Sequence, residues 1–287
     1  MKVLVLGATG MLGHKLARVL ADEDFEVVGT VRAGAQHWHA HPALAEIPLV
    51  EAVQAENFDS VLGVMASARP LAVINCIGIV KSHESAEDPL PMITVNALFP
   101  HRLARACQAA GCRLIHVSTD CVFSGRKGNY TEDDTPDPVD LYGRAKLMGE
   151  VAGPGALTLR TSMIGREIAG PHGLLEWFLG RRGGRAPGWR RAIFSGPTTL
   201  ELARAVARLL REQPGLEGLW HLAADPISKL ELLGLIDKAY GLGTRIEPDD
   251  SVAVDRSLDA GRLRQATAIV PPPWPEMIEQ MRRDENS

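Results

Sequence analysis

The sequence predicts an α/β protein built on a doubly wound parallel sheet, followed by a smaller and irregular C-terminal domain. The first observation is that short apolar runs alternate with helical segments through the first half of the chain. Strands buried on both faces of a parallel sheet are apolar throughout, and strand–helix alternation places helices on both faces of such a sheet. The second observation is a change after residue 160, where glycine, proline and arginine become dense between residues 165 and 196. We therefore predict a main domain over residues 1–162 and a second domain over 163–287, some segments of which can return to the first.

The apolar periodicity assigns the individual elements in chain order. Strands are predicted at residues 2–6, 25–31, 49–53, 71–75, 113–118 and 156–159, and helices at 11–20, 60–68, 91–110 and 142–151. In the second half, the pattern predicts helices at 199–211 and 229–240 and a strand at 218–223. The prolines at 271–275 should block regular structure before a last helical turn or two.

Composition limits the classes of protein to which the chain can belong. Of its 287 residues 45% are hydrophobic, enough for a large core, and its 31 basic and 35 acidic residues leave a net charge of −4. A chain with this balance has no general affinity for nucleic acid. No apolar run reaches the roughly 18 residues of a membrane span, and the first apolar run enters a glycine motif too early for a secretion signal. We expect a soluble cytoplasmic protein that does not bind membranes.

The four cysteines show no metal-binding pattern. None forms a Cys-X-X-Cys pair, and no cluster of cysteine and histidine has the spacing of a zinc site. Cys76 and Cys107 lie in apolar surroundings that are typical of packing residues. No metal site is predicted.

A glycine motif stands between the first predicted strand and the first predicted helix. It runs Gly-Ala-Thr-Gly-Met-Leu-Gly over Gly7–Gly13. Glycine permits a tight turn and a close approach of the backbone to a pyrophosphate, and the helix N-terminus offers free N–H groups to the phosphates. Ordinary turns also use glycine, but this position predicts a Rossmann-type dinucleotide site. The residues expected to contact the cofactor here are Gly7, Thr9, Gly10, Met11, Leu12 and Gly13.

The end of the second predicted strand indicates which dinucleotide binds. A carboxylate there would hold the 2′-hydroxyl of NAD. The segment 29–34 contains no carboxylate, but it contains Arg32. A guanidinium is a natural partner for the 2′-phosphate of NADP. We therefore expect NADP, with NAD as the alternative; Arg32 would otherwise be a surface arginine in a loop.

Two further groups of side chains carry reaction chemistry. Tyr142 and Lys146 are spaced i and i+4, so on a helix they share a face, and a nearby ammonium favours the phenolate. The strand before them ends in Ser118-Thr119-Asp120, and a hydroxyl there can donate to a substrate carbonyl while the tyrosine delivers a proton. Both Ser118 and Thr119 carry a hydroxyl that can donate to the substrate carbonyl. Without the glycine motif, these residues would be an exposed helix pair and a simple turn.

These motifs make the chain resemble the extended short-chain dehydrogenase/reductase superfamily, and more narrowly the dTDP-4-dehydrorhamnose reductase family. The resemblance covers nearly the whole chain and is strongest over residues 1–160. The most selective strings are Ser-Thr-Asp-Cys-Val-Phe-Ser-Gly at 118–125 and Tyr-Gly-Arg-Ala-Lys-Leu-Met-Gly-Glu at 142–150. The other marks are Gly7–Gly13, Asn75–Gly78, Val95–Asn96 and Leu159–Ser162.

The resemblance implies a role for each matching residue. Thr119 would polarise the keto oxygen, Tyr142 would donate the proton, and Lys146 would hold the cofactor ribose. The residues expected along the cofactor are Gln54 and Ala55, beside the adenine, and Cys76, Gly78 and Ile79. The residues expected around the substrate are Ser118, Asp120, Met163 and Arg190, so that the domain over 163–287 would mainly bind the substrate.

Two departures from the family limit what the resemblance implies. The residue after Ser-Thr-Asp is usually tyrosine and here is Cys121, and the residue after Arg-Thr-Ser is usually tryptophan and here is Met163. Nucleotide-sugar 4,6-dehydratases have glutamate at the position of Cys121, and a thiol is a poor replacement for that acid. The chain is thus expected to reduce a 4-keto group on a nucleotide-linked 6-deoxysugar.

The expected substrate is dTDP-4-dehydrorhamnose or a UDP-linked N-acetyl 4-keto sugar, in surface-polysaccharide or deoxysugar biosynthesis. The alternatives are a nucleotide-sugar epimerase, which would use the same tyrosine and lysine, and a non-catalytic NADP-binding regulatory subunit. A homodimer is compatible with each of these functions.

Overall fold

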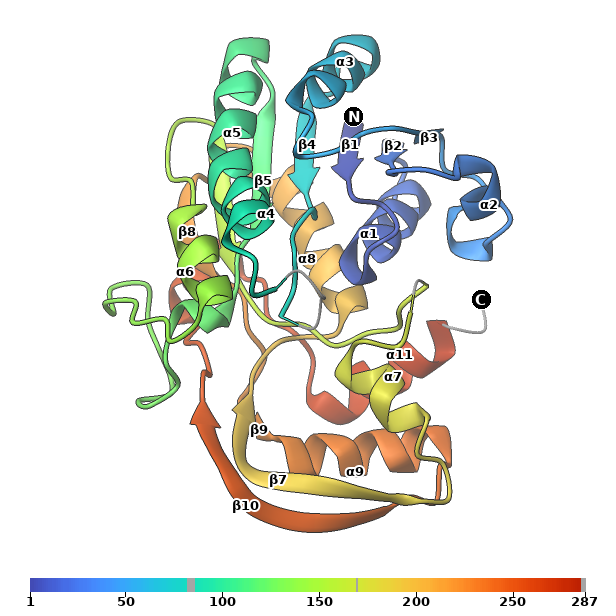
Figure 1. The fold of residues 1–287 in the computed structure, drawn as a ribbon, viewed down its shortest axis with the longest axis vertical. Helices are drawn as coiled ribbons and strands as arrows, with labels where there is room; N and C mark the ends of the chain where they lie inside the picture. Colours follow the sequence, from blue (N-terminus) through green and yellow to red (C-terminus); the bar gives the residue numbers. More distant parts are fainter. Residues whose placement is uncertain (82–85, 169, 285–287) are drawn as a thin grey trace.

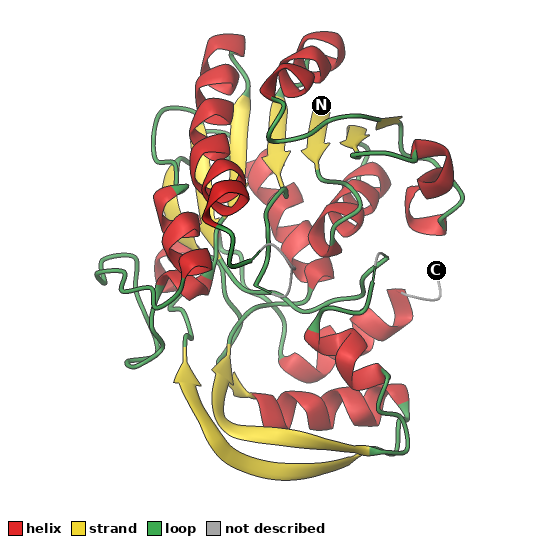
Figure 2. Ribbon diagram, in the orientation of Figure 1, coloured by secondary structure: helices red, strands yellow, loops and turns green. Residues whose placement is uncertain are grey.

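The computed structural model describes residues 1–81, 86–168 and 170–284, and a seven-stranded parallel sheet lies at its centre (Figure 1, Figure 2). Its strands are β1 (Lys2–Leu6), β2 (Glu26–Thr30), β3 (Leu49–Val50), β4 (Ala72–Asn75), β5 (Arg113–Val117), β6 (Ala156–Arg160) and β8 (Gly218–His221). They are arranged in the order β3-β2-β1-β4-β5-β6-β8. The order reverses direction between β1 and β4, which is where open α/β sheets bind ligands. The predicted doubly wound α/β fold is confirmed.

Helices cover both faces of this sheet because its strands alternate their side chains between two cores. Val3 and Val5 of β1 belong to one apolar cluster, and Leu4 and Leu6 belong to the other. The first cluster is covered by α1 (Met11–Asp22) and α8 (Thr199–Glu212). The second is covered by α3 (Phe58–Ala68), α5 (Phe99–Ala110) and α6 (Leu141–Met148).

The long helix predicted at 91–110 begins earlier and is irregular. It consists of α4 (Pro89–Ile93), a π-helical turn η2 (Thr94–Leu98) and α5. A π turn inserts an extra residue into the helical ladder, and such turns are frequent at functional sites. Here the turn brings the side chain of Asn96 to the loop that follows β4.

A smaller unit lies beyond the carboxyl ends of the main strands (Figure 1). It contains a three-stranded sheet of order β10-β7-β9, made of β7 (Arg185–Phe194), β9 (Ile227–Ser228) and β10 (Arg245–Asp255). Its helices are α7 (Leu174–Leu179), α9 (Lys229–Tyr240) and α11 (Trp274–Asp284), which share an apolar cluster of their own. The remaining short elements are α2 (Ala35–His39), η1 (Pro42–Leu44), η3 (Asp120–Val122) and α10 (Gly261–Thr267).

Two features of the second half differ from the prediction. Strands β7 and β10 were not predicted, since their arginines, glycines and prolines hide the apolar alternation. Pro248 is tolerated because β10 is an edge strand, where no ladder partner needs its missing N–H. The last helix is longer than a turn or two, because Pro275 lies in its first turn, where proline is well tolerated.

Part of the second half returns to the main sheet. Strand β8 pairs with β6, and α8 packs on α1. The boundary between residues 162 and 163 stays a prediction. Within the described part of the chain, none of the helices combines the length and apolar character needed to span a membrane.

Candidate active site

The glycine motif forms a turn that leaves no room for side chains. Gly7 has a φ of +80°, which glycine adopts at no steric cost. A Cβ at Gly13 would lie 2.1 Å from the carbonyl oxygen of Gly7, so α1 packs directly on the end of β1. Gly10 occupies the N-cap position without a capping side chain, which leaves the first N–H groups of α1 open. This turn has the open N–H groups and the close backbone approach that the predicted pyrophosphate site requires.

The loop after β4 lies against this turn and is held by Asn96. A Cβ at Gly7 would meet the side chain of Ile77 at 3.1 Å. The Ile79 amide donates to Asn96 Oδ1 at 3.0 Å, and Asn96 Nδ2 donates to the Ile79 carbonyl at 2.8 Å. Gly78 is held close to the same side chain, so Cys76, Gly78 and Ile79 line the edge between β1 and β4. The role of Asn96 was missed, although Val95–Asn96 was one of the family marks.

The ends of β2 and β3 frame the place expected for the adenine ribose. Arg32 is exposed and has no hydrogen bond or ion pair with the described part of the chain. The exposed Gln54 and the buried Ala55 follow β3, and the Gln54 amide donates to Ser60 Oγ at 3.0 Å. The carboxylate of Glu51 accepts a hydrogen bond from the Ala35 amide. This carboxylate was not predicted, because it reaches the turn after β2 from β3, about twenty residues along the chain from where a ribose-binding carboxylate was expected.

The residues that we predicted for the reaction centre lie where β5 ends and α6 begins. Thr119 is 6% exposed, and its Oγ1 accepts a hydrogen bond from the Cys121 amide at 3.1 Å. Asp140 caps α6 by accepting from the Gly143 amide at 2.7 Å. A Cβ at Gly143 would lie 2.3 Å from the Cys121 carbonyl oxygen, so α6 packs directly on the turn after β5. This packing brings Tyr142 within hydrogen-bonding reach of Thr119.

The electrostatics of this centre differ from the expectation in one respect. Burial raises the pKa of Tyr142, the nearby Cys121, Asp120 and Asp140 raise it further, and the hydrogen bond with Thr119 lowers it. The Nζ of Lys146 donates to the Val117 carbonyl at 2.7 Å. The pKa of Tyr142 is thus raised in this structure, where the sequence led us to expect a lowering, and the role of Lys146 toward the phenolate stays a prediction. Burial also lowers the pKa of Lys146 to about 8, against a raising effect of Glu150.

Ser118 and Thr119 point in opposite directions, as successive residues of an extended segment do. The Ser118 hydroxyl donates to Glu150 Oε1 at 2.7 Å, away from Tyr142. Of the two hydroxyls, Thr119 is the one that interacts with Tyr142, and the assignment of Ser118 to the substrate stays a prediction without support from this contact. Glu150 in turn accepts two hydrogen bonds of 2.8 Å from Arg160, and both side chains are buried.

Asp120 and Cys121 face the same space as Thr119. The Thr119 hydroxyl donates to Asp120 Oδ1 at 3.2 Å. Burial raises the pKa of Asp120, and burial together with the charge of Asp120 raises the pKa of Cys121 to about 11. The thiol therefore stays protonated at neutral pH. It can line a pocket, but it is no substitute for a carboxylic acid.

Two residues predicted at the substrate lie elsewhere. Met163 is half-buried and packs against the core under α1 and α8. Arg190 lies on the exposed face of β7, where its Nε donates to Asp250 Oδ1 of β10 at 2.9 Å. Neither contact involves Tyr142, and both assignments to the substrate stay predictions.

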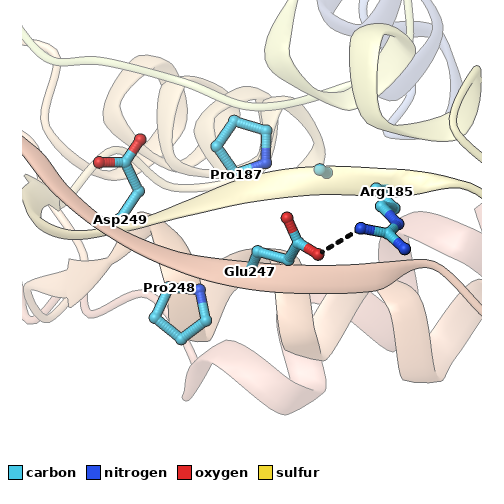
Figure 3. Close-up of a pocket in the computed structure, with 6 residues that line it drawn as sticks. Arg185, Pro187, Glu247, Pro248 and Asp249 are labelled. Carbon is cyan, nitrogen blue, oxygen red and sulfur yellow. Dashed lines mark hydrogen bonds and ion pairs between the residues drawn. The ribbon is translucent and has the colours of Figure 1, made fainter.

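A depression on the small sheet is remote from this chemistry (Figure 3). It is lined by Arg185, Ala186, Pro187, Glu247, Pro248 and Asp249. An ion pair of 3.2 Å between Arg185 and Glu247 crosses it. Arg185 is the first residue of β7, and the other end of this strand leads back to the main domain. The two ends are separated by nine residue steps of about 3.3 Å each. We assign no function to this depression.

Together, the fold and the site define the class of the protein. A Rossmann-type sheet, a glycine turn at β1 and a tyrosine–lysine pair on α6 are the features of an extended short-chain dehydrogenase/reductase. The family model of the RmlD substrate binding domain matches residues 1–285. The chain belongs to that family.

Relatives from several lineages share this architecture. The chain is 34% identical to dTDP-4-dehydrorhamnose reductase of Mycolicibacterium smegmatis over 171 residues, 58% of this chain and 46% of the relative. It is 32% identical to methionine adenosyltransferase 2 subunit beta of Danio rerio over 176 residues, 58% and 49% of the two chains. The matched segments thus span about half the length of these relatives. The crystal structure of dTDP-4-dehydrorhamnose reductase from Bacillus anthracis in complex with NADP has a TM-score of 0.80 at 21% identity, covering 99% of each chain.

Proposed function

We propose that this protein uses NADPH to reduce a 4-keto group on a nucleotide-linked 6-deoxysugar. The observation that carries the proposal is the convergence of Thr119, Tyr142 and Lys146 at the carboxyl end of β5, two strands from the glycine turn that follows β1 at the same edge of the sheet. Substrate candidates are dTDP-4-dehydrorhamnose and UDP-linked N-acetyl 4-keto sugars. The relative from Mycolicibacterium smegmatis supports the first of these.

The residues of the centre divide the work of carbonyl reduction. The reduced nicotinamide supplies a hydride when it is bound. Thr119 donates a hydrogen bond to the keto oxygen, and Tyr142 transfers its phenolic proton to the same oxygen. A raised pKa suits this role, since the acid must still hold its proton when the substrate arrives. Lys146, whose Nζ now bonds to the Val117 carbonyl, is placed to hold the cofactor ribose and to balance the phenolate that Tyr142 becomes.

NADP is the proposed cofactor, with NAD as the alternative. The exposed Arg32 is free to pair with a 2′-phosphate at the end of β2. The similar Bacillus anthracis structure was solved with NADP. Glu51 works in the opposite direction, because its carboxylate lies at the same turn and would repel a phosphate while accepting a ribose hydroxyl.

The second candidate is a regulatory subunit that binds NADP without turnover. The likeness to methionine adenosyltransferase 2 subunit beta favours it. The complete set of Thr119, Tyr142 and Lys146 favours the enzyme, since a sensing subunit has no need of a proton donor. Turnover separates the two: a binding subunit is stabilised by NADPH but consumes none.

The test of the enzyme assignment is Tyr142→Phe, assayed with a panel of dTDP- and UDP-linked 4-keto-6-deoxysugars. The variant keeps the ring packing and loses the acid, so kcat should fall by about 10²–10⁴-fold. NADPH affinity and the free energy of unfolding should stay near the parental values. A variant that reduces the sugars at the parental rate would show that Tyr142 is not the acid.

A further inference from the structure

Lys146 is a buried cation that sits close to the pH at which it loses its charge. The residue is only 5% exposed, and its Nζ donates to the Val117 carbonyl at 2.7 Å. Withdrawal of an ammonium from water favours its neutral form, and burial lowers the pKa of Lys146 to about 8. The proposed role of Lys146, which is to hold the cofactor ribose and to balance a phenolate, needs the charge. A group that opposes the effect of burial would therefore control how well Lys146 performs this role.

Three titratable side chains near Lys146 carry no charge at neutral pH. Cys76 follows β4, and burial raises the pKa of its thiol to about 12, so the thiol keeps its proton. His116 lies on β5, and burial together with the charge of Lys146 lowers the pKa of its imidazole, so the ring stays neutral. Tyr142, one turn earlier on α6, keeps its proton because burial raises its pKa. None of these three groups compensates the charge of the ammonium.

Glu150 brings a carboxylate toward Lys146 from the end of α6. The Gly149 amide donates to the Lys146 carbonyl at 3.1 Å, so the chain continues the helical turn beyond the last residue of α6. A Cβ at Gly149 would lie 1.9 Å from the Asn96 carbonyl oxygen, so this turn packs directly against η2. Residues four apart in a helical turn share a face, which places Glu150 on the side of Lys146. The Glu150 side chain is only 10% exposed.

Two successive residues at the end of β5 anchor the ammonium and the carboxylate. The Val117 carbonyl accepts from Lys146, and the hydroxyl of Ser118, the next residue, donates to Glu150 Oε1 at 2.7 Å. The two charges are thus held close together, and the charge of Glu150 raises the pKa of Lys146. Arg160 binds the same carboxylate through two hydrogen bonds of 2.8 Å. One buried carboxylate is therefore shared by two buried cations.

We propose that Glu150 is a positioning residue that keeps the Lys146 ammonium charged and in place for the cofactor, and that Arg160 limits this effect by sharing the carboxylate. The inference rests on the proposed function, because that function gives the charge of Lys146 its use. Since the two cations compete for one negative charge, removal of the carboxylate and removal of the guanidinium should affect Lys146 in opposite directions. A network that only stabilised the fold would not produce opposite signs.

The experiment measures the ionisation of Lys146 directly, by NMR of protein labelled at the lysine Cε, between about pH 6 and pH 10. Lys146→Met assigns the signal, because the signal disappears in this variant. The parental midpoint should lie at about 8. Glu150→Gln should lower the midpoint by about one pH unit or more, and Arg160→Met should raise it, since one nearby charge is removed in each case. The pH at which NADPH binding declines, measured by titration, should move in the same direction as the midpoint.

The double variant Glu150→Gln/Arg160→Met guards against a single variant that does not fold, because it removes both partners of the buried pair. Its Lys146 midpoint should lie between those of the two single variants, so comparison with either of them tests the sign. The matched controls are Glu212→Gln and Arg208→Met, which break a bidentate pair on the surface of α8. Both controls should keep the parental midpoint and the parental NADPH affinity.

Three results would overturn the inference. The first is a Lys146 midpoint that stays at the parental value in Glu150→Gln. The second is a shift in the same direction in Glu150→Gln and Arg160→Met. The third is a shifted midpoint that NADPH binding does not follow.

The titration is independent of turnover, which separates this inference from the proposed function. A parent that reduces 4-keto sugars, while Lys146 titrates alike in the parent and in Glu150→Gln, would retain its function and lose this role of Glu150. A parent that reduces none of the sugars, yet shows opposite shifts of the midpoint and of NADPH binding in Glu150→Gln and Arg160→Met, would retain the role and lose the reductase assignment.

Discussion

Replacement of Arg160 by methionine should be among the most destabilising single changes in this chain. The guanidinium of Arg160 makes two 2.8 Å hydrogen bonds to Glu150, and the two side chains are only 3% and 10% exposed. Methionine keeps most of the apolar volume but leaves the Glu150 carboxylate buried, with the Ser118 hydroxyl as its hydrogen-bond donor and Lys146 as a nearby cation among the described residues. Breaking one half of a buried pair costs about 3–5 kcal/mol. We expect a loss of that size in the free energy of unfolding.

Denaturant unfolding of four proteins measures this loss and assigns its cause. They are the parent, Arg160→Met, Glu150→Gln and the double variant. The double variant should be more stable than Arg160→Met, because it removes the stranded charge along with its partner. Arg208→Met is the matched control, since it breaks a bidentate pair with Glu212 at the surface, and it should change stability little.

The pH dependence provides a second readout of the same cause. The stranded Glu150 of Arg160→Met can escape its cost by taking up a proton. The folded variant then binds a proton that the unfolded chain releases, so its stability should increase as pH falls. The deficit relative to the parent should be larger at pH 8 than at pH 5. Two results would refute this reasoning. One is a loss in the free energy of unfolding of Arg160→Met under about 1 kcal/mol, far below the usual cost of breaking a buried pair. The other is a double variant that is no more stable than Arg160→Met.

Three further predictions concern the site. Lys146→Met should weaken NADPH binding as well as turnover. In the parent, both NADPH binding and turnover should decline as pH rises through about 8, because burial lowers the pKa of Lys146 and its ammonium loses its charge there. A flat pH profile up to pH 9.5 would contradict this. Arg32→Ala should weaken the binding of NADPH more than that of NADH, and Glu51→Gln should weaken the binding of NADH more than that of NADPH. Titrations of each variant with both cofactors measure this. Equal Kd values for the two cofactors in the parent would remove the basis for both predictions. Cys121→Ser should keep most of the kcat, because neither transfer needs a thiol, and a loss as large as that of Tyr142→Phe would mean that the acid is misassigned.

The main sheet could be predicted from the sequence because its strands are buried on both faces. Each is a continuous apolar run, and the structure reproduces all of the predicted strands to within a few residues. The small sheet could not be predicted on the same basis. Its long strands β7 and β10 carry charged residues and face solvent on one side, so their pairing depends on contacts between segments sixty residues apart.

The site shows the same division between local and distant information. Tyr142 and Lys146 were found because a helix fixes their separation, whereas Ser118 and Thr119 could be told apart only once Glu150 was seen to take the Ser118 hydroxyl. Arg256, whose Nε donates to the Phe123 carbonyl at 2.8 Å, carried no signal in its own segment. Arg256 reaches the turn after β5 only because the small domain folds back over it.

The surroundings of Tyr142 also bear on the direction of the proposed reaction. An epimerase first oxidises its sugar, so its tyrosine must begin as a base, whereas a reductase needs an acid at the start. Burial and the neighbouring Cys121, Asp120 and Asp140 raise the pKa of Tyr142 and keep its proton in place. Lys146, the group that could reverse this, is turned to the Val117 carbonyl. In this arrangement Tyr142 holds its proton, which is the state that the proposed reduction requires at its start.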